Sequence, residues 1–239
     1  MATYGLYLES GPRRRKTMIH VLDLLGCVAV GATTEEAIAA TPEAIEAYRG
    51  FPRCHGERVA APARIETRVV EQITEGQWLG NGSPAATFGP DRQPVTPREV
   101  EIFLRRFHWF REALAAWAGS RTAAQLDSAG GSGGRPARAV LHHVLAVPGA
   151  YLSVPLGSSE GFSAVGGAVE RGELALPEAL RRIGAMIAER VRATTAEERA
   201  RVVQRPDGVR TLRKALRLIL EHDWEHLVEL SRRPGGPAL

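Results

Sequence analysis

The chain has 239 residues, 44% of them hydrophobic and 24% charged, with a formal net charge of +4. These values are ordinary for a soluble globular protein, and the length suits one large domain or two small ones around a real core. The one dense basic run, residues 13–16, is short and follows Gly11 and Pro12. We expect a solvated turn there, because a nucleic-acid surface needs a broad basic face.

Neither the cysteines nor the apolar segments suggest an exported or membrane protein. Cys27 and Cys54 are too few for a disulfide framework and lack a partner at CxxC spacing, and Cys27 should be a small core residue. The first residues lack the basic-then-apolar order of a signal peptide, and no apolar run approaches the roughly 18 residues of a membrane span. We therefore expect a cytoplasmic protein that does not bind membranes.

The first third of the chain predicts a small α+β domain, which we place at residues 1–80. Alternating apolar residues predict strands at residues 3–9, 17–22, 26–31 and 65–73, the first two as a hairpin. Thr33 and Glu36 have the spacing of a capping box, which begins a helix that should end near Gly50. Pro42 lies inside this helix and would kink it or shift its start.

This order of three strands, a helix and a strand resembles the HicB family. The resemblance is carried by residues 21–31 (VLDLLGCVAVG), residues 33–37 (TTEEA) and the pair Ala44-Ile45, within roughly residues 4–73. Leu25 stands where the family commonly has proline. The resemblance implies an antitoxin-like module that masks a small RNA-cleaving protein partner. A scaffold or dimerisation module without a ligand is the alternative, and we expect a homodimer.

DNA is not an expected partner. HicB proteins often carry an added DNA-binding segment, but the segment added here is of another kind. The chain has no recognisable helix-turn-helix and no broad basic face, so we expect no sequence-specific DNA binding.

A stretch rich in glycine and proline follows the first domain. Between Gly76 and Pro97 it has the composition of a linker, and we place the linker itself at residues 81–96. Trp78 and Phe88 predict that this stretch is pinned against a neighbouring part of the protein rather than free.

Residues 97–239 have the periodicity of amphipathic helices. Thr96, Pro97 and Glu99 form a strong helix start. The apolar stripe that follows is Phe103, Phe107, Phe110, Leu114 and Trp117. Further helices are predicted at about residues 136–151, 177–191 and 211–233, with a short turn capped by Thr195, glycine-rich breaks at 130–134 and 157–167, and a turn at Asp207-Gly208. These four helices predict an all-α four-helix bundle.

His222 and His226 lie four residues apart inside the last of these helices. Residues i and i+4 stack on one helix face, so both imidazoles can bind one metal ion at roughly 2.0–2.1 Å. A third histidine on the second bundle helix, His142 or His143, strengthens the metal interpretation, because buried imidazoles need a partner. Two surface histidines are the alternative for the HxxxH pair alone. His108 is expected to be a packed or surface residue rather than a ligand.

Two carboxylates flank the histidine pair. Asp223 and Glu225 lie beside His222 and His226 in the sequence. They are candidates for groups that support the ligands or handle protons. Solvated helix carboxylates are the favoured alternative for both.

Residues 97–232 resemble the DinB family of bacterial four-helix proteins. The resemblance is carried by Val140-Leu141-His142-His143 and by residues 216–227 (LRLILEHDWEHL). It places His143 with His222 and His226. It implies a divalent ion, zinc or nickel, with an open fourth position, which is the arrangement of catalytic rather than structural zinc. It also implies a small-molecule substrate and a low-molecular-weight thiol, in transferase, isomerase or hydrolase reactions.

The second bundle helix departs from the DinB pattern. Residues 147–151 (VPGAY) stand where family members often have a glutamate and aromatic residues. This departure predicts a displaced pocket wall. Glu160 or Glu225 could then close the fourth metal position.

Two functions remain open from the sequence. The first is a metal-dependent enzyme, a thiol-dependent transferase or hydrolase that activates a thiol or a water molecule. The second is a non-catalytic binding or regulatory protein, in which the HicB-like domain recruits a protein partner and the metal is structural.

Overall fold

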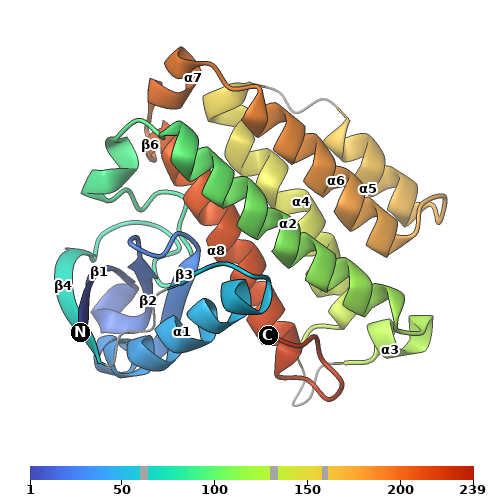
Figure 1. Ribbon diagram of the computed structural model, residues 1–239, viewed down its shortest axis with the longest axis horizontal. Coiled ribbons are helices and arrows are strands. Elements are labelled where there is room, and N and C mark those ends of the chain that lie inside the picture. The colour runs from blue at the N-terminus through green and yellow to red at the C-terminus, as the bar shows by residue number, and fades with distance from the viewer. Residues whose placement is uncertain (60–63, 130–133, 158–160) are drawn as a thin grey trace.

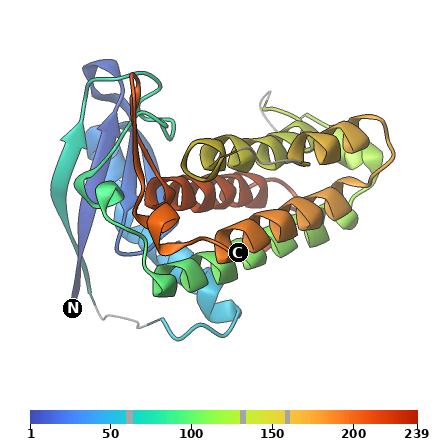
Figure 2. The same cartoon turned by 90° about the horizontal axis from the view of Figure 1, so that it is seen from above.

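The computed structural model describes residues 1–59, 64–129, 134–157 and 161–239, without the side chain of Arg14. A four-stranded mixed sheet at the N-terminus is followed by a mostly helical region, and the helices in the described ranges are α1 to α8 (Figure 1). The sheet lies at one end of the long helices, which extend away from it (Figure 2).

The sheet has the strand order β3-β2-β1-β4. β1 (Ala2–Ser10) and β2 (Arg15–Val21) form the predicted antiparallel hairpin, β3 (Cys27–Thr33) is antiparallel to β2, and β4 (Ile65–Ile73) runs parallel to β1. The turn after β1 contains a short 3-10 helix, η1 (Pro12–Arg14). Arg13, Arg15 and Lys16 are exposed, so the prediction of a solvated turn is confirmed.

Helix α1 (Thr34–Cys54) packs against one face of the sheet. The Thr33 hydroxyl accepts a hydrogen bond from the backbone N–H of Glu36, as the capping box predicts. The predicted end near Gly50 is wrong, because the helix runs on to Cys54. Phe51 explains the extension: it is buried, with its ring centroid 5.4 Å from that of Phe110 in the bundle. Tertiary packing of this kind overrides the local preference for an end at glycine.

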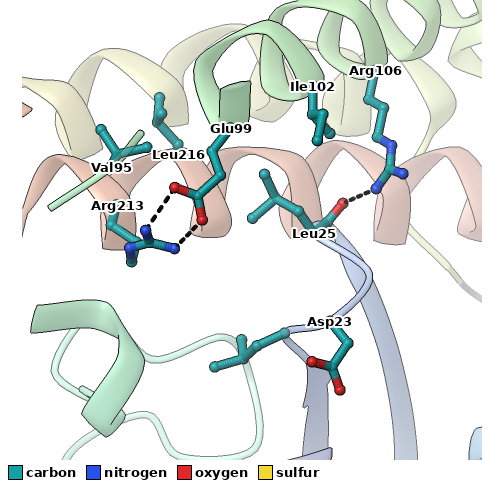
Figure 3. Close-up of a pocket in the computed structure, with 9 residues that line it drawn as sticks. Asp23, Leu25, Val95, Glu99, Ile102, Arg106, Arg213 and Leu216 are labelled. Atoms are coloured by element: carbon teal, nitrogen blue, oxygen red, sulfur yellow. Dashed lines mark hydrogen bonds and ion pairs between the residues drawn. The ribbon is translucent and has the colours of Figure 1, made fainter. Parts of the chain in front are cut away.

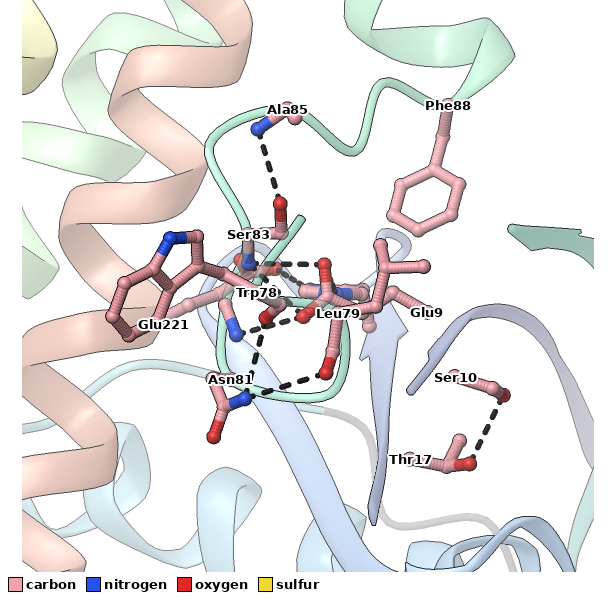
Figure 4. A network of polar contacts seen from close by, with 12 residues as sticks. Glu9, Ser10, Thr17, Trp78, Leu79, Asn81, Ser83, Ala85, Phe88 and Glu221 are labelled. Carbon is pink, nitrogen blue, oxygen red and sulfur yellow. Dashed lines mark hydrogen bonds and ion pairs between the residues drawn. The ribbon is translucent and has the colours of Figure 1, made fainter. Parts of the chain in front are cut away.

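The glycine- and proline-rich segment covers the other face of the sheet. Phe88 is fully buried, with its ring centroid 5.1 Å from that of His20, so it pins the segment as predicted. The Glu9 carboxylate accepts hydrogen bonds from the backbone N–H groups of Gly82 and Ser83 (Figure 4). The same prediction is wrong for Trp78, which is 75% exposed. Its backbone adopts a left-handed φ of 61°, and the indole projects out of the segment (Figure 4).

Four long helices form the bundle: α2 (Pro97–Gly119), α4 (Ala137–Leu156), α6 (Leu176–Arg192) and α8 (Leu212–Ser231). α2 packs against α6 and α8, and α4 packs against the same two helices. The predicted capping box of Thr96 and Glu99 is present at the start of α2. The stripe from Phe103 to Leu114 is buried, as its spacing predicts.

Helix α4 differs from its prediction. It continues through the buried Pro148 to Leu156 instead of ending near Tyr151. A proline inside a helix removes one backbone hydrogen bond, but contacts with α5, α6 and α8 hold this part of α4 in place. From the sequence we expected no apolar segment as long as a membrane span, but α4 is long and apolar enough to cross a membrane by length and composition. In this fold it is a packed helix of the bundle.

Several short elements were not predicted or only partly predicted. α3 (Ala123–Asp127) is new, and α5 (Phe162–Glu170) occupies much of the predicted glycine-rich break at 157–167. The turn capped by Thr195 is α7 (Ala196–Ala200), and the turn at Asp207-Gly208 joins β5 (Val202–Arg205) to β6 (Gly208–Thr211). Such short elements give too few residues for periodicity to be visible. The predicted break at 130–134 lies almost entirely outside the described residues.

The buried apolar side chains form one core that extends from the sheet into the bundle. Trp224 of α8 lies at the junction, with its ring centroid 5.0 Å from that of Tyr48 in α1 and 5.5 Å from that of Phe110 in α2. Cys27 is a buried core residue, as predicted. The N-terminal region therefore positions α8 directly.

A buried ionic network also joins the sheet to α8. His20 of β2 is fully buried, with Nδ1 3.0 Å from Glu221 Oε1 and Nε2 3.8 Å from Glu9 Oε2. The Glu221 carboxylate also accepts a hydrogen bond of 2.7 Å from Arg217. Arg217 donates two further hydrogen bonds to Asp91, each of 2.9 Å. Burial lowers the pKa of His20, but the Glu221 and Glu9 carboxylates outweigh this effect and raise its pKa to about 9.

This network predicts a pH dependence of stability. The imidazolium of His20 stabilises the fold fully below its unfolded pKa of 6.5, and the stabilisation is lost as the pH rises through about 9. The His20 ring should titrate near pH 9 in an NMR experiment. His20→Gln should remove the corresponding fall in the free energy of unfolding between these two pH values. A His20 ring that titrates at or below 6.5 would contradict the assignment.

Candidate metal centre

Three histidines from two facing helices meet in the bundle. His222 and His226 lie one turn apart on α8, and His143 faces them from α4. The ring centroids are separated by 4.8 Å (His143 to His222), 5.2 Å (His143 to His226) and 4.5 Å (His222 to His226). One ring nitrogen from each lies within 4.8 Å of the others. Of the two neighbouring histidines on α4, the structure brings His143, and not His142, into this group.

The hydrogen bond that His226 makes leaves one of its ring nitrogens available to bind a metal ion. Nδ1 of His226 lies 2.8 Å from Oε2 of Glu229. With a carboxylate as acceptor, Nδ1 carries the proton and Nε2 keeps its lone pair, which is the usual arrangement of a histidine that binds a metal. Glu229 is itself held by Arg233 at 2.9 Å and by Arg135 at 3.4 Å. The hydrogen bond from His226 is the main reason that the pKa of Glu229 falls to about 2.

His222 is the most unusual member of the cluster. Both of its ring nitrogens are buried and neither has a hydrogen-bond partner among the described residues. The nearest carboxylate oxygen, Oδ1 of Asp223, lies 3.6 Å from Nδ1, which is too far for a hydrogen bond. Burial lowers the pKa of His222 to about 4, and burial followed by the charge of His226 also lowers the pKa of His143. Neutral imidazole is the form that binds a metal, and a buried imidazole without a partner is costly, so these residues fit a metal ion.

Asp223 does not face the cluster as a solvated or proton-handling carboxylate. It is fully buried and accepts hydrogen bonds of 2.7 and 3.1 Å from Arg111 of α2. Arg111 donates a further hydrogen bond of 3.0 Å to the Val144 carbonyl of α4. The interpretation of Asp223 as a solvated residue is therefore wrong. Its ion pair with Arg111 joins three bundle helices directly beside the histidines.

Glu225 lies in a small cavity of about 20 Å³ next to His222. This volume is enough to hold one water molecule. Met18 of β2, Asn81 of the segment before α2 and Tyr151 of α4 are also part of its wall. Burial is the main cause that raises the pKa of Glu225, and burial raises the pKa of Tyr151 to about 12. Because α4 continues through Pro148, Tyr151 is part of the wall, and the N-terminal region supplies the opposite side.

The remaining predicted residues lie elsewhere. His108 is an exposed residue of α2 outside the cluster, in line with its prediction as a surface residue. Glu160 lies outside the described residues. Arg111, Glu221 and Glu229 were not singled out from the sequence. Glu229 could have been, because it lies three residues after His226 on the same helix face, whereas Arg111 has no sequence signal that links it to α8.

Comparisons with known proteins give little further information. No protein-family model matches the chain, and no curated protein matches it. One solved structure, YfiT from Bacillus subtilis, is similar over 63% of this chain and 95% of its own, at 21% sequence identity and a TM-score of 0.45. YfiT is described as a probable metal-dependent hydrolase with an unusual four-helix bundle topology. A likeness of this size carries no argument about the function of this chain.

The Arg111–Asp223 pair makes a prediction about stability. Asp223→Ala should lower the free energy of unfolding by about 3–5 kcal/mol, because it leaves a buried guanidinium without its partner. The double variant Arg111→Leu, Asp223→Leu should be less destabilised than the single variant. The measurement is urea-induced unfolding of each variant. Glu112→Ala breaks the exposed pair with Arg181 and should cost no more than about 1 kcal/mol. Equal effects of Asp223→Ala and Glu112→Ala would contradict the proposed role of the buried pair.

Proposed function

We propose that the chain is a metal-dependent enzyme in which His143, His222 and His226 hold one divalent ion. The observation that carries this proposal is the His222 ring, buried with two unpartnered nitrogens between two other histidines. A metal ion bound at one of these nitrogens would satisfy that nitrogen without a protein hydrogen bond. The DinB-like resemblance of the sequence agrees with this assignment but does not carry it.

An open fourth position favours catalysis over a structural metal. Within the described residues the cluster consists of three histidines and has no cysteine, aspartate or glutamate as a fourth member. Structural zinc sites hold four protein ligands, whereas catalytic sites hold three and keep one position for water or substrate. Neutral imidazole ligands suit several transition metals, and the DinB-like resemblance narrows these to zinc or nickel. We propose one of these two ions.

Other residues of the chain have defined parts in this proposal. A bound divalent ion would supply positive charge that polarises an oxygen or sulfur atom of the reactants. Glu229 fixes the tautomer of His226, and the Arg111–Asp223 pair keeps α8 aligned with α2 and α4. The Tyr151 hydroxyl stays protonated at neutral pH, because burial raises its pKa to about 12, and it can donate a hydrogen bond to a substrate. Two carboxylates line the same cavity, and Glu221 is already paired with Arg217 and His20. Glu225 is therefore the candidate for proton transfer by position.

We propose a thiol-dependent transferase or a hydrolase as the reaction class. The DinB-like motifs suggest a low-molecular-weight thiol, and the cavity beside His222 accepts a group of about one water molecule, which a thiol sulfur or a hydrolytic water would match. The alternative is a binding protein with a structural metal, in which the HicB-like region recruits a protein partner. The state of the fourth metal position separates the two.

The metal assignment predicts the content of purified protein. Protein prepared without added metal should contain close to one equivalent of a divalent ion by elemental analysis. His143→Ala, His222→Ala and His226→Ala should each weaken binding by more than about 100-fold, because loss of a ligand exceeds the 10- to 100-fold effect of losing a residue that only supports one. His108→Ala is the matched control and should bind as the wild type does. Tight metal retention in the His222→Ala, His226→Ala double variant would refute the site.

The open position predicts that a thiol reaches the metal. Cobalt-substituted protein should develop a sulfur-to-metal charge-transfer band when a small thiol is added, because a metal-coordinated thiol is deprotonated. Glu225→Gln should leave metal content unchanged and lower turnover by about 100-fold or more if this carboxylate transfers a proton. A flat thiol titration of fully loaded protein, without hydrolysis of simple esters or amides, would favour the structural-metal alternative.

A further inference from the structure

A second buried cation lies on α8, two turns before His222. Lys214 is 1% exposed, and its ammonium donates hydrogen bonds of 2.7 Å to the Thr87 hydroxyl and 3.1 Å to the Val209 carbonyl. Both acceptors are neutral, and an ammonium has three donors. No carboxylate within the described ranges forms an ion pair with Lys214. Lysine is also rare here: 29 of the 31 basic residues are arginine, and Lys214 is one of two lysines.

The two carboxylates whose charges raise the pKa of Lys214 are already paired with arginines. Asp91 accepts two hydrogen bonds from Arg217, and Asp207 accepts one from Arg210. Burial, followed by the charge of Arg217, lowers the pKa of Lys214 to about 7, although the charges of Asp91 and Asp207 act in the opposite direction. A buried charge without a counter-charge is unfavourable. Lys214 is therefore placed to gain an anionic partner from outside the chain.

Lys214 lines a cavity that has room for such a partner. The cavity has a volume of about 290 Å³. Its lining is mainly apolar and includes Tyr151, Val154 and Leu218 beside Lys214 and Arg210. Lys214 lies in the first turn of α8, where the helix dipole adds positive potential. The cavity thus combines apolar walls with two basic residues, of which Arg210 is already paired with Asp207 and Lys214 has no acidic partner.

A second cavity can be compared with the Lys214 cavity by the charged groups that line each of them. It has a volume of about 160 Å³ and lies between the turn after β2, α2 and α8 (Figure 3). Both of its arginines already have acidic partners, because Arg213 pairs with Glu99 and Arg106 pairs with Glu57 and donates to the Leu25 carbonyl. It has no charged group comparable to Lys214, and we assign it no ligand.

The Lys214 cavity lies next to the small cavity beside the metal centre. Tyr151 and Leu218 line both this cavity and the small cavity that contains His222 and Glu225. Lys214, Leu218 and His222 are spaced by four residues, so they form one stripe along α8. At 1.5 Å per residue, Lys214 and His222 are separated by about 12 Å along the helix axis.

The distance between Lys214 and His222 along α8 and the volume of the Lys214 cavity both indicate the size of a ligand, and the two values agree. An extended chain advances about 3.3–3.6 Å for every three bonds, so 12 Å corresponds to about ten bonds. A volume of 290 Å³ corresponds to about ten water molecules at about 30 Å³ each, and hence to about ten non-hydrogen atoms.

We propose that this cavity binds an amphipathic organic anion of about ten non-hydrogen atoms, with its anionic group at Lys214 and its apolar chain along Leu218 toward His222. Binding of the anion depends on Lys214 and on the cavity alone. The further statement that the far end of the ligand is the reacting end rests on the proposed metal-dependent function. A carboxylate and a phosphate share the chemistry that Lys214 recognises, so the experiment has to compare them.

The test is calorimetric titration of metal-free protein with hexanoate, octanoate, decanoate, octyl phosphate and octanol. One of the octyl anions should bind at least about ten times more tightly than octanol, because hydrogen bonds to charged groups are stronger than neutral ones. The better of the two anions identifies the headgroup. At pH 8 binding should take up a proton, since Lys214 is largely neutral there and the anion favours its charged form. Equal affinity for octanol and both anions, or no proton uptake, would overturn the proposal.

Variants separate this site from general charge effects. Lys214→Met keeps the length of the side chain and should lower the affinity for the octyl anion by about tenfold or more, without lowering the melting temperature. Val154→Phe narrows the cavity and should weaken decanoate more than hexanoate. Arg232→Met removes an exposed cation from the end of α8 and should have no effect. Unchanged affinity in Lys214→Met would refute the site.

The metal readouts are independent of this test. Metal content and the thiol titration should be normal in Lys214→Met, which is far from the histidines along α8. Anion binding without metal would leave the present inference standing and would refute only the metal-dependent function. Loss of anion selectivity in a metal-loaded wild-type protein would refute this inference and leave the metal centre intact.

Discussion

Helix α8 is buried along most of its 20 residues, although it carries two arginines, a lysine and several carboxylates and histidines. A charged group inside a protein needs a partner there, because water is not available to solvate it. The partners cannot come from α8 alone, since residues on one helix contact only neighbours three or four positions away. They come from the sheet, the segment before α2, and the other bundle helices.

This requirement interlocks the two parts of the chain. Arg217 and Glu221 bind Asp91 and His20, which belong to the N-terminal half. Asp223 binds Arg111 of α2 on the other side. Breaking either set would leave a buried charge, so the sheet and the bundle hold α8 in one register. The aromatic contacts of Trp224 with Tyr48 and Phe110 add apolar packing at the same junction. These contacts position the metal centre, because His222 lies between Glu221 and Asp223, and His226 follows one turn later on the same helix.

Two groups on α8 stand out because they are not fully satisfied from within the described chain. His222 has two buried nitrogens without partners, and Lys214 has only neutral acceptors. They line two neighbouring cavities that share Tyr151 and Leu218. Unsatisfied buried groups are rare in folded proteins. Their occurrence on one stripe of α8 is the physical basis for assigning a metal to one group and an organic anion to the other.

Local sequence patterns determined much of the fold. The alternation of apolar residues located the strands of the sheet, and the capping boxes at Thr33 and Thr96 located two helix starts. These features depend on contacts within a few residues, so they can be read from the sequence. The apolar stripes likewise predicted the long bundle helices. Helix ends were less predictable: α1 and α4 run past Gly50 and Pro148 because packing against the bundle outweighs local preference.

The candidate site likewise has features that the sequence determines and features that depend on the tertiary structure. The pairing of His222 with His226 follows from helix periodicity alone. The choice between His142 and His143 was left open by the residues themselves, because it depends on how α4 is rotated against α8. The sequence also could not show that Asp223 is committed to Arg111, that Tyr151 faces His222, or that Lys214 lacks an acidic partner. Each of these depends on which side chains from distant segments meet, and only the tertiary structure decides that.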